Sequence, residues 1–328
     1  MNSTDTVIVI GGGSGMGLAV ARRCLAAGAS VVIAGRSPGR LHDAAAGLAC
    51  PGRLRAVPAD IGDRAQVTAL FERAGAIRHV VVTAADLPYG PVAALTEDAM
   101  MRAVRSKFLG PFFVAQEAAA RMNEGGSVTF TSGIAAYRPA PGGALAASVN
   151  GALEAMVRAF ALELAPIRVN AVSPGWVDTP IWAGLATPEA KQARFGDLAS
   201  RLPGRRAGTA EDVARAIGYL IEDDFVTGTV LHAEGGPAAR LASGVQVGQH
   251  REHPAVAVLG GTQVELDEHV VDVLADRLLG DVQPRGDAGV GQPLRHQREH
   301  LALPRSQPDA SGSWPGPVLP GVPVNRSR

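Results

Sequence analysis

The chain predicts an α/β fold in three layers, with a doubly wound parallel sheet between two layers of helices. Short apolar runs typical of buried strands alternate with helical patterns over roughly the first 240 residues. The first of these runs leads through a glycine-rich turn into a helix. The 328 residues are 46% apolar, enough to bury the core of one large domain. Together these features favour a Rossmann-type domain.

Each strand and helix of that domain is expected from its own pattern. The predicted strands cover residues 7–10, 31–34, 55–58, 79–83, 127–131, 169–172 and 229–231. The clearest helical patterns cover residues 19–27, 66–74, 97–122 and 144–165. The last two are rich in alanine and leucine and too apolar for simple surface helices. We therefore expect them to pack against the sheet and against a second subunit, in a homo-oligomer that is a dimer or a tetramer.

The composition changes after about residue 242. We expect residues 1–242 to form the single domain and residues 243–328 to be an irregular, low-complexity and largely disordered extension, with one helix at 266–279. Five of the eight histidines fall in this extension. Their spacing is not that of metal ligands, so no metal site is predicted.

The overall composition narrows the possible partners and compartment. The 31 basic residues balance the 31 acidic ones, which gives no reason to expect a nucleic-acid partner. Two cysteines, Cys24 and Cys50, are too few for a disulfide framework. The N-terminus lacks a basic leader, and no apolar run reaches the roughly 18 residues that a membrane span needs. A cytoplasmic protein without membrane contact is the expectation.

The turn after the first strand has the form of a phosphate cradle. Glycine tolerates positive φ and lets a pyrophosphate approach the helix N-terminus, where free N–H groups and the helix dipole favour an anion. The predicted contacts are Gly11, Gly13, Ser14, Gly15, Met16 and Gly17. Because a strand and a second βα unit surround this turn, the chain is predicted to bind a dinucleotide.

The residues after the second and third strands bear on the kind of dinucleotide. Where an acidic side chain would accept hydrogen bonds from an unphosphorylated ribose, this chain has Gly35 and Arg36. A guanidinium can bind a 2′-phosphate, so NADP (NADPH) is favoured over NAD, the alternative being a solvated arginine. Asp60 is placed to meet the adenine amino group, or else caps the helix predicted at 66–74.

Several ordered motifs resemble the short-chain dehydrogenase/reductase family, over roughly residues 5–242. Its glycine turn is matched by Gly11, Gly15 and Gly17, and its adenine-contacting pair by Asp60–Ile61. Residues 82–85, which include Ala84, resemble its fourth strand end, residues 131–132 the end of its serine strand, and residues 167–175 are nearly verbatim. The segment that would meet the nicotinamide carboxamide and the phosphates contributes Pro174, Gly175, Val177 and Thr179. Residues 181–202 would form a mobile substrate lid.

That resemblance implies hydride transfer between a nicotinamide and a carbonyl or alcohol, yet the family's catalytic set is altered. Ser132 matches its substrate-orienting serine. The family's Tyr-x-x-x-Lys falls on Ala146 to Asn150, and a shift by one residue does not restore it. Lys107 stands where the family has an asparagine. We interpret this as a reciprocal exchange in which Lys107 and Asn150 keep one ammonium and one amide in the pocket. The alternative is a lysine that extends outward to solvent.

A replacement for the catalytic tyrosine is harder to identify. Tyr137, five residues after Ser132, is the candidate proton donor, with a simple pocket-wall aromatic as the alternative. The predicted function is an NADP-dependent oxidoreductase of this type, acting on a carbonyl, alcohol or unsaturated-ring small molecule. A redox-inactive cofactor-sensing regulator, and a lyase or cyclase on the same scaffold, remain alternatives because a fold does not determine function.

Overall fold

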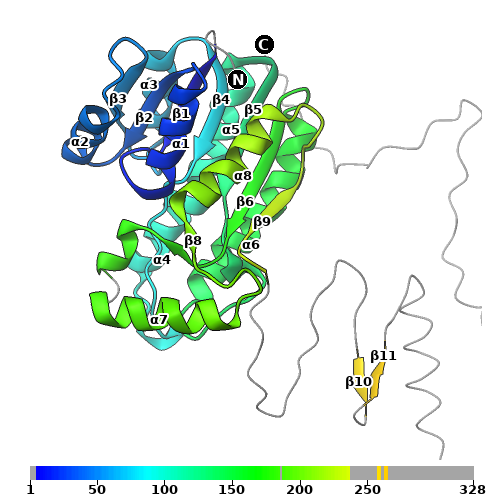
Figure 1. Cartoon of the computed structure of the whole chain (residues 1–328). Coiled ribbons are helices and arrows are strands. Elements are labelled where there is room, and N and C mark those ends of the chain that lie inside the picture. The colour runs from blue at the N-terminus through cyan, green and yellow to red at the C-terminus, as the bar shows by residue number, and fades with distance from the viewer. Residues whose placement is uncertain (1–4, 185–186, 237–256, 260–261, 265–328) are drawn as a thin grey trace, which may run out of the picture. The chain divides into compact units, whose positions relative to one another are not determined.

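The computed structural model describes residues 5–184, 187–236, 257–259 and 262–264. The chain divides into one unit at Met1–Gly244 and another at Val245–Arg328 (Figure 1). In the second unit, strand β10 (Ala257–Leu259) pairs antiparallel with β11 (Thr262–Val264). The helix expected at 266–279 lies outside the described residues.

The first unit is built on a seven-stranded parallel sheet in the order β3-β2-β1-β4-β5-β6-β9 (Figure 1). All seven predicted strands are in it. They are β1 (Thr6–Ile10), β2 (Ser30–Gly35), β3 (Leu54–Pro58), β4 (Ile77–Val82), β5 (Met122–Thr131), β6 (Arg168–Pro174) and β9 (Val230–Ala233). The predicted Rossmann-type α/β fold is therefore confirmed.

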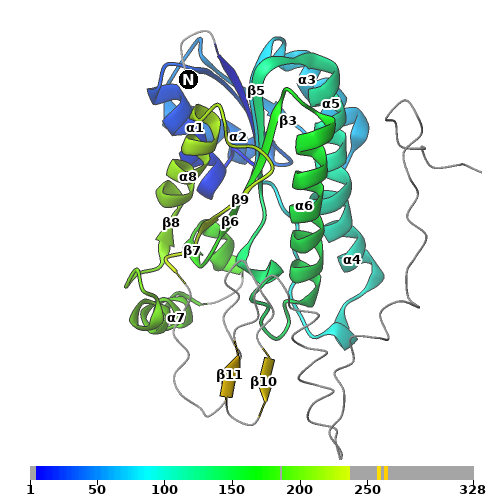
Figure 2. The ribbon, with the colours of Figure 1, turned by 90° about the vertical axis from the view of Figure 1, so that its right-hand side faces the viewer.

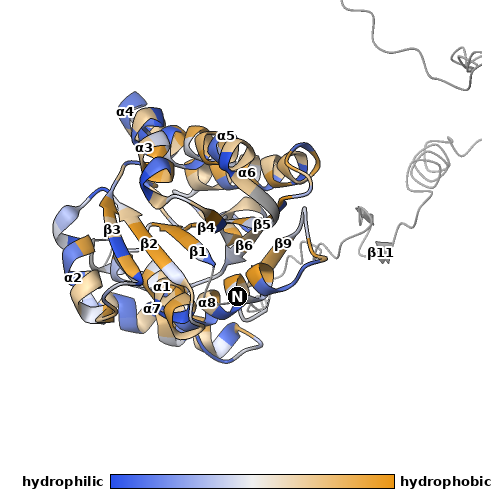
Figure 3. Cartoon of the chain, turned by 90° about the horizontal axis from the view of Figure 1, so that it is seen from above, coloured by the Kyte–Doolittle hydropathy of each residue, from blue (hydrophilic) through white to orange (hydrophobic). Residues whose placement is uncertain are grey.

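Helices cover both faces of this sheet, which explains why its strands are apolar on both sides. One layer contains α1 (Gly15–Ala26), α2 (Pro38–Leu48) and α8 (Ala210–Glu222), and the other α3 (Arg64–Ala74), α5 (Gly110–Arg121) and α6 (Ala144–Glu163). In β1, Val7 and Val9 pack in the first layer's core, and Ile8 and Ile10 in the second layer's. Figures 2 and 3 show the two layers from the side and from above.

The strand order reverses between β1 and β4, and ligands of such sheets bind at the carboxyl ends of the strands beside this reversal. The elements that complete this end follow β4, β5 and β6 in the chain. They are η1 (Val92–Ala94), α4 (Glu97–Val104), η3 (Ile134–Ala136), β7 (Val177–Asp178), η4 (Pro180–Gly184), α7 (Pro188–Arg201) and β8 (Gly208–Thr209).

The single helix expected over 97–122 is interrupted. Between α4 and α5 the chain makes a π-helical turn, η2 (Arg105–Leu109), and the N–H of Gly110 donates to the carbonyl of Arg105. Pro111 accounts for it, because a proline inside a helix lacks an N–H and its ring clashes with the carbonyl four residues earlier, here that of Lys107. A wider turn relieves this clash, and π turns are frequent at functional sites.

Among the described helices, α6 alone has the length and composition of a membrane span. In this fold it covers the sheet instead, because Leu153, Met156, Val157 and Phe160 pack into the core on its inner side. Its outer side carries apolar residues that the described part of the chain leaves exposed, among them Leu162, which is 82% exposed.

Candidate functional site

The glycine turn after β1 is as tight as the sequence predicts. Gly11 has φ +96°, a conformation that side chains disfavour. A Cβ on Gly11 would lie 2.6 Å from the backbone nitrogen of Ala84, at the end of β4. A Cβ on Gly17 would lie 2.2 Å from the carbonyl oxygen of Gly11. The start of α1 is thus packed directly against the ends of β1 and β4.

The first turn of α1 leaves its backbone donors free to bind a ligand. Ser14 is the N-cap residue, its side chain makes no capping hydrogen bond, and no acidic residue lies in the first turn. Across from this turn, a Cβ on Gly15 would lie 3.4 Å from Cβ of Thr179. The uncapped N–H groups and the helix dipole suit a pyrophosphate, and Gly13, Ser14, Gly15 and Met16 are all partly exposed.

Arg36 follows β2 and is neither buried nor unpaired. Its side chain is 58% exposed and donates from Nη1 to Oδ2 of Asp86 at 2.7 Å. Nε of Arg102 lies 3.8 Å from the other oxygen of Asp86. The guanidinium is therefore held beside the end of β2 by a carboxylate from the loop after β4.

Asp60 does not cap a helix, so that alternative is wrong. Its Oδ1 accepts from the N–H of Gly62 at 2.9 Å, and the N-cap of α3 is Asp63, whose side chain accepts from Gln66. The neighbouring Ile61 is buried, and a Cβ on Gly110 would lie 2.8 Å from its Cγ1. Ile61 thus fixes the start of α5.

The segment after β6 supports an aromatic cluster. Val177 is buried, and its carbonyl accepts from Nε1 of Trp182 at 2.8 Å. The Trp182 ring stacks on Trp176 with centroids 5.3 Å apart and meets Phe195 edge-on at 5.3 Å. Gly175, which immediately precedes Trp176, packs tightly on Glu234 at the end of β9. The lid predicted at 181–202 corresponds to η4 and α7, joined through this cluster to the Pro174–Thr179 segment.

Lys107 points into the protein, which contradicts the alternative of an outward lysine. Its side chain comes from the π turn η2 and is almost fully buried. Nζ donates to the carbonyl of Thr131, and to that of Ser132 at 3.3 Å. Burial lowers the pKa of Lys107 to about 7, and the carboxylate of Glu154 opposes that fall. An amine that exchanges protons near neutral pH therefore lies at the end of β5.

Ser132 and Asn150 are buried beside it. Oγ of Ser132 donates to Oε1 of Glu154 at 2.6 Å. Asn150, on α6, has a buried Oδ1 without a hydrogen-bond partner, and a Cβ on Gly133 would lie 3.0 Å from its Nδ2. Buried acceptors are rarely left unsatisfied, so Oδ1 of Asn150 suits a donor from a bound molecule or a water.

Glu154 is a site residue that sequence reasoning missed. The signal was present, because Glu154 lies four residues after Asn150 and residues at this spacing share one face of a helix. A glutamate inside a helix is more commonly solvent-exposed, so the pattern alone did not single it out.

Tyr137 lies beyond η3 and is already engaged. Its hydroxyl donates to Oε2 of Glu234, which Arg138 also contacts. Its ring meets that of His232 edge-on, with centroids 4.7 Å apart. Burial, together with the hydrogen bond to Glu234, raises the pKa of Tyr137 above its ordinary value. The phenol is thus a weaker acid than a free tyrosine.

Comparisons with known proteins agree with this arrangement. A family model described as enoyl-(acyl carrier protein) reductase matches residues 11–237. The short-chain dehydrogenase/reductase ATR9 of Stachybotrys chlorohalonatus is 35% identical over 245 residues, which cover 71% of this chain and 96% of that protein.

Two solved structures extend the agreement to three dimensions. The MalC reductase/Diels-Alderase from Malbranchea aurantiaca has a TM-score of 0.67 at 32% identity, over 71% of this chain and 95% of that one. A short-chain dehydrogenase from Burkholderia cenocepacia in complex with NADP has a TM-score of 0.65 at 29% identity, over 71% and 97%. From its sequence, sheet order and glycine cradle, the chain belongs to the short-chain dehydrogenase/reductase family.

Proposed function

We propose that this protein is an NADP-dependent oxidoreductase that interconverts a carbonyl and an alcohol, or reduces an unsaturated ring, in a small molecule. The observation that carries the proposal is the polar cluster at the end of β5, where Ser132, Lys107 and Asn150 are buried together. The sequence has Ala146 and Asn150 where its relatives' family pattern has tyrosine and lysine. The buried amine and amide support a reciprocal exchange of Lys107 and Asn150.

The residues present fit a nicotinamide dinucleotide. The glycine cradle and the uncapped start of α1 would hold the pyrophosphate, with Thr179 opposite. Asp60 and Ile61, just after β3, would contact the adenine, and Ala84 near the end of β4 borders the cradle. The unsatisfied Oδ1 of Asn150 suits a ribose hydroxyl. When bound, this cofactor supplies or accepts the hydride, and the chain's own residues orient the substrate and move the proton.

Arg36 supports a preference for NADP. The end of β2 carries a guanidinium and no carboxylate, and a 2′-phosphate can replace Asp86 as its partner. The NADP complex of the similar Burkholderia protein agrees with this preference. Hydrogen bonds to charged groups contribute about 1.5–3 kcal/mol, so Arg36→Ala should weaken NADPH binding by about ten- to a hundredfold and leave NADH binding nearly unchanged.

The test is a titration with NADPH and NADH, followed by quenching of the stacked pair Trp176 and Trp182. Saturable binding that favours NADPH, and loses that preference in Arg36→Ala, would support the proposal and justify a substrate panel. If neither nucleotide binds, the oxidoreductase proposal is wrong.

A second candidate function is a cyclase or lyase on the same scaffold. It is favoured by one observation, the likeness to a protein named as both a reductase and a Diels-Alderase. A third candidate function is that of a cofactor-sensing regulator. Such a protein would bind NADPH tightly but would not oxidise it with any carbonyl compound of the panel. Product analysis distinguishes the cyclase from the regulator, because a cyclase forms a new ring from a polyene or an imine without consuming NADPH.

We also propose that the protein forms a homo-oligomer through the outer faces of α5 and α6. The rings of Phe108 and Phe112 lie 5.5 Å apart, and Phe112 meets Phe160 of α6 at 5.0 Å. Phe108 and Phe112 are more than a third exposed, and Leu162 is mostly exposed. Exposed apolar side chains on two neighbouring elements are typical of a protein interface.

A further inference from the structure

The hydroxyl of Ser132 is oriented by a carboxylate. A serine has one proton to donate, and here it goes to Oε1 of Glu154 at 2.6 Å. That distance is typical of an O–H···O⁻ bond to an ionised acceptor, which is roughly twice as strong as a neutral one. With its proton committed, Oγ of Ser132 can offer only lone pairs to a substrate.

Glu154 also acts on Lys107. It projects from α6, one turn after Asn150, and is partly buried. Of the charged groups on the described elements around η2, its carboxylate is the one that favours the ammonium form of Lys107 against the effect of burial. Lys107 in turn donates to the backbone carbonyl of Ser132 at 3.3 Å. Lys107 on η2, Ser132 just after β5 and Glu154 on α6 therefore form one polar group.

We propose that Glu154 is the proton acceptor of this site, acting through the hydroxyl of Ser132, and so replaces the acid–base function of the missing tyrosine. This inference rests on the proposed oxidoreductase function. Ser132 touches the substrate and is the catalytic residue, while Glu154 acts through it. The amine of Lys107 holds the main chain at Thr131 and Ser132.

In alcohol oxidation the proton and the hydride leave in opposite directions. The substrate O–H bond breaks and its proton passes to Oγ of Ser132, whose own proton passes to Oε1 of Glu154. At the same time the C–H bond breaks, its hydrogen leaves with the electron pair for the oxidised nicotinamide, and the C=O bond forms. In the reverse direction, protonated Glu154 returns its proton through Ser132 to the alkoxide oxygen. Oxidation therefore needs ionised Glu154, and reduction needs the protonated acid.

The first test uses the fact that the chain contains only two lysines, Lys107 and Lys191. Protein labelled with ¹³C at lysine Cε gives one resonance for each, and Lys191, paired with Asp178 at 2.6 Å, serves as an internal reference. In Glu154→Gln the titration of Lys107 should move to lower pH while Lys191 does not move. Glu163→Gln, at the exposed end of the same helix, is the matched control and should move neither.

The second test is hydride transfer in a single turnover, with NADPH affinity measured alongside. Glu154→Gln should bind NADPH as the wild type does, transfer hydride about 10²- to 10⁴-fold more slowly and lose the pH dependence of oxidation. Glu154→Asp should restore part of both the rate and the pH dependence.

The outcomes separate the two proposals. A Glu154→Gln variant with the wild-type rate and pH profile would overturn the relay while the oxidoreductase function stands. An unmoved Lys107 titration in that variant would overturn the coupling of Lys107 to Glu154, with no substrate involved. A wild type that binds NADPH but transfers no hydride across the substrate panel would overturn the proposed function, and the relay with it.

Discussion

At Gly17 the backbone leaves no room for a side chain, which makes the cofactor cradle sensitive to a single methyl group. A Cβ there would lie 2.2 Å from the carbonyl oxygen of Gly11 and 2.6 Å from Oγ1 of Thr83. Gly17→Ala must therefore push α1 away from the sheet, at a cost of about 1–3 kcal/mol of unfolding free energy, and should weaken NADPH binding.

The matched control for Gly17→Ala is Gly47→Ala. Gly47 lies near the end of α2, and a Cβ there would meet nothing within 4 Å. This variant should keep NADPH binding and leave the unfolding free energy unchanged or slightly higher. Thermal unfolding and nucleotide titration measure both effects; equal behaviour of the two variants would contradict the close packing of the cradle.

Lys107 gives the protein a pH-dependent stability of known sign. Its pKa falls from 10.5 in the unfolded chain to about 7 in the folded protein. Between those values the unfolded state binds the extra proton, so the unfolding free energy rises as the pH is raised from 7 toward 10.5. From pH 7 to 9 this group alone should add about 2 kcal/mol.

Urea unfolding of wild type and Lys107→Met at pH 7 and pH 9 isolates this contribution, because the other titrating groups are common to both. The wild type should gain stability relative to the variant as the pH rises. A difference between the two proteins that stays constant with pH would show that Lys107 titrates normally and is not buried.

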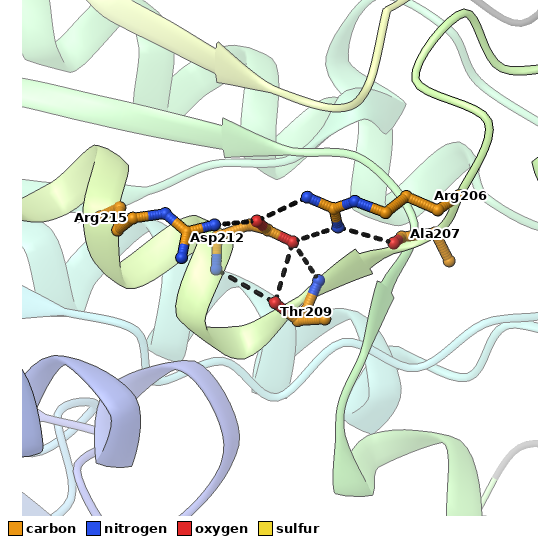
Figure 4. A network of polar contacts seen from close by, with 5 residues as sticks. All are labelled: Arg206, Ala207, Thr209, Asp212 and Arg215. Atoms are coloured by element: carbon orange, nitrogen blue, oxygen red, sulfur yellow. Dashed lines mark hydrogen bonds and ion pairs between the residues drawn. The ribbon is translucent and has the colours of Figure 1, made fainter.

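Among the elements, α8 is anchored by a network of polar contacts at its N-terminus (Figure 4). The side chain of Thr209 accepts from the N–H of Asp212, and the Asp212 carboxylate accepts from the N–H of Thr209, so the two form a capping box. Arg206 and Arg215 also contact this carboxylate. The hydrogen bonds from Arg206 are the main cause of a pKa of Asp212 well below its ordinary value.

Asp212→Asn should lower the unfolding free energy by about 1–2 kcal/mol, because residue 212 loses its ion pairs with Arg206 and Arg215 and the negative charge that favours the start of α8, while Thr209 still caps the helix. The contribution is present above the ordinary aspartate pKa and is lost as the pH falls below it. Denaturant unfolding at pH 7 measures the loss. Glu211→Gln, one residue earlier, removes an ion pair with the exposed Arg22 and should cost at most about 0.5 kcal/mol. An equal cost for both variants would argue against the capping network.

The strands of this fold were predictable from sequence, while the geometry of the long helix was not. The central strands β1, β2 and β4 are runs rich in β-branched residues and are largely buried, so their pattern does not depend on distant contacts. The pattern over 97–122 indicated one helix, although Pro111 marked where it had to change. A proline signals an interruption without specifying its kind, so neither the π turn nor the inward direction of Lys107 followed from it.

The residues of the candidate site were likewise predictable from the sequence only in part. The glycine cradle, Ser132 and the Lys107–Asn150 pair were recognisable because each belongs to a motif at fixed spacing. Glu154 and Asp86 were not, because their functions arise from contacts with residues 22 and 50 positions away in the chain. Such contacts form only when the sheet brings strand ends together.

On the scale of the whole molecule, the outer sides of α5 and α6 carry apolar side chains that the described residues leave exposed. The apolar composition of α6 exceeds what its own sheet buries, and Phe108, Phe112 and Leu162 remain exposed. Burying apolar area contributes about 25 cal/mol per Å², so a second copy on this face would gain from every such side chain. Symmetric dimers bring the same patch of both copies together.

Leu162→Glu should therefore shift the protein toward monomers without unfolding it, because Leu162 is 82% exposed and supports no core of its own. A charge placed in an apolar interface has to be desolvated, which should weaken association at least about tenfold. Phe225→Glu is the matched control: Phe225 is 91% exposed in the loop after α8, and its replacement should leave the oligomer intact. Sedimentation velocity over a range of concentrations distinguishes the cases. A monomeric wild type would exclude the oligomer, and equal dissociation of both variants would place the interface elsewhere.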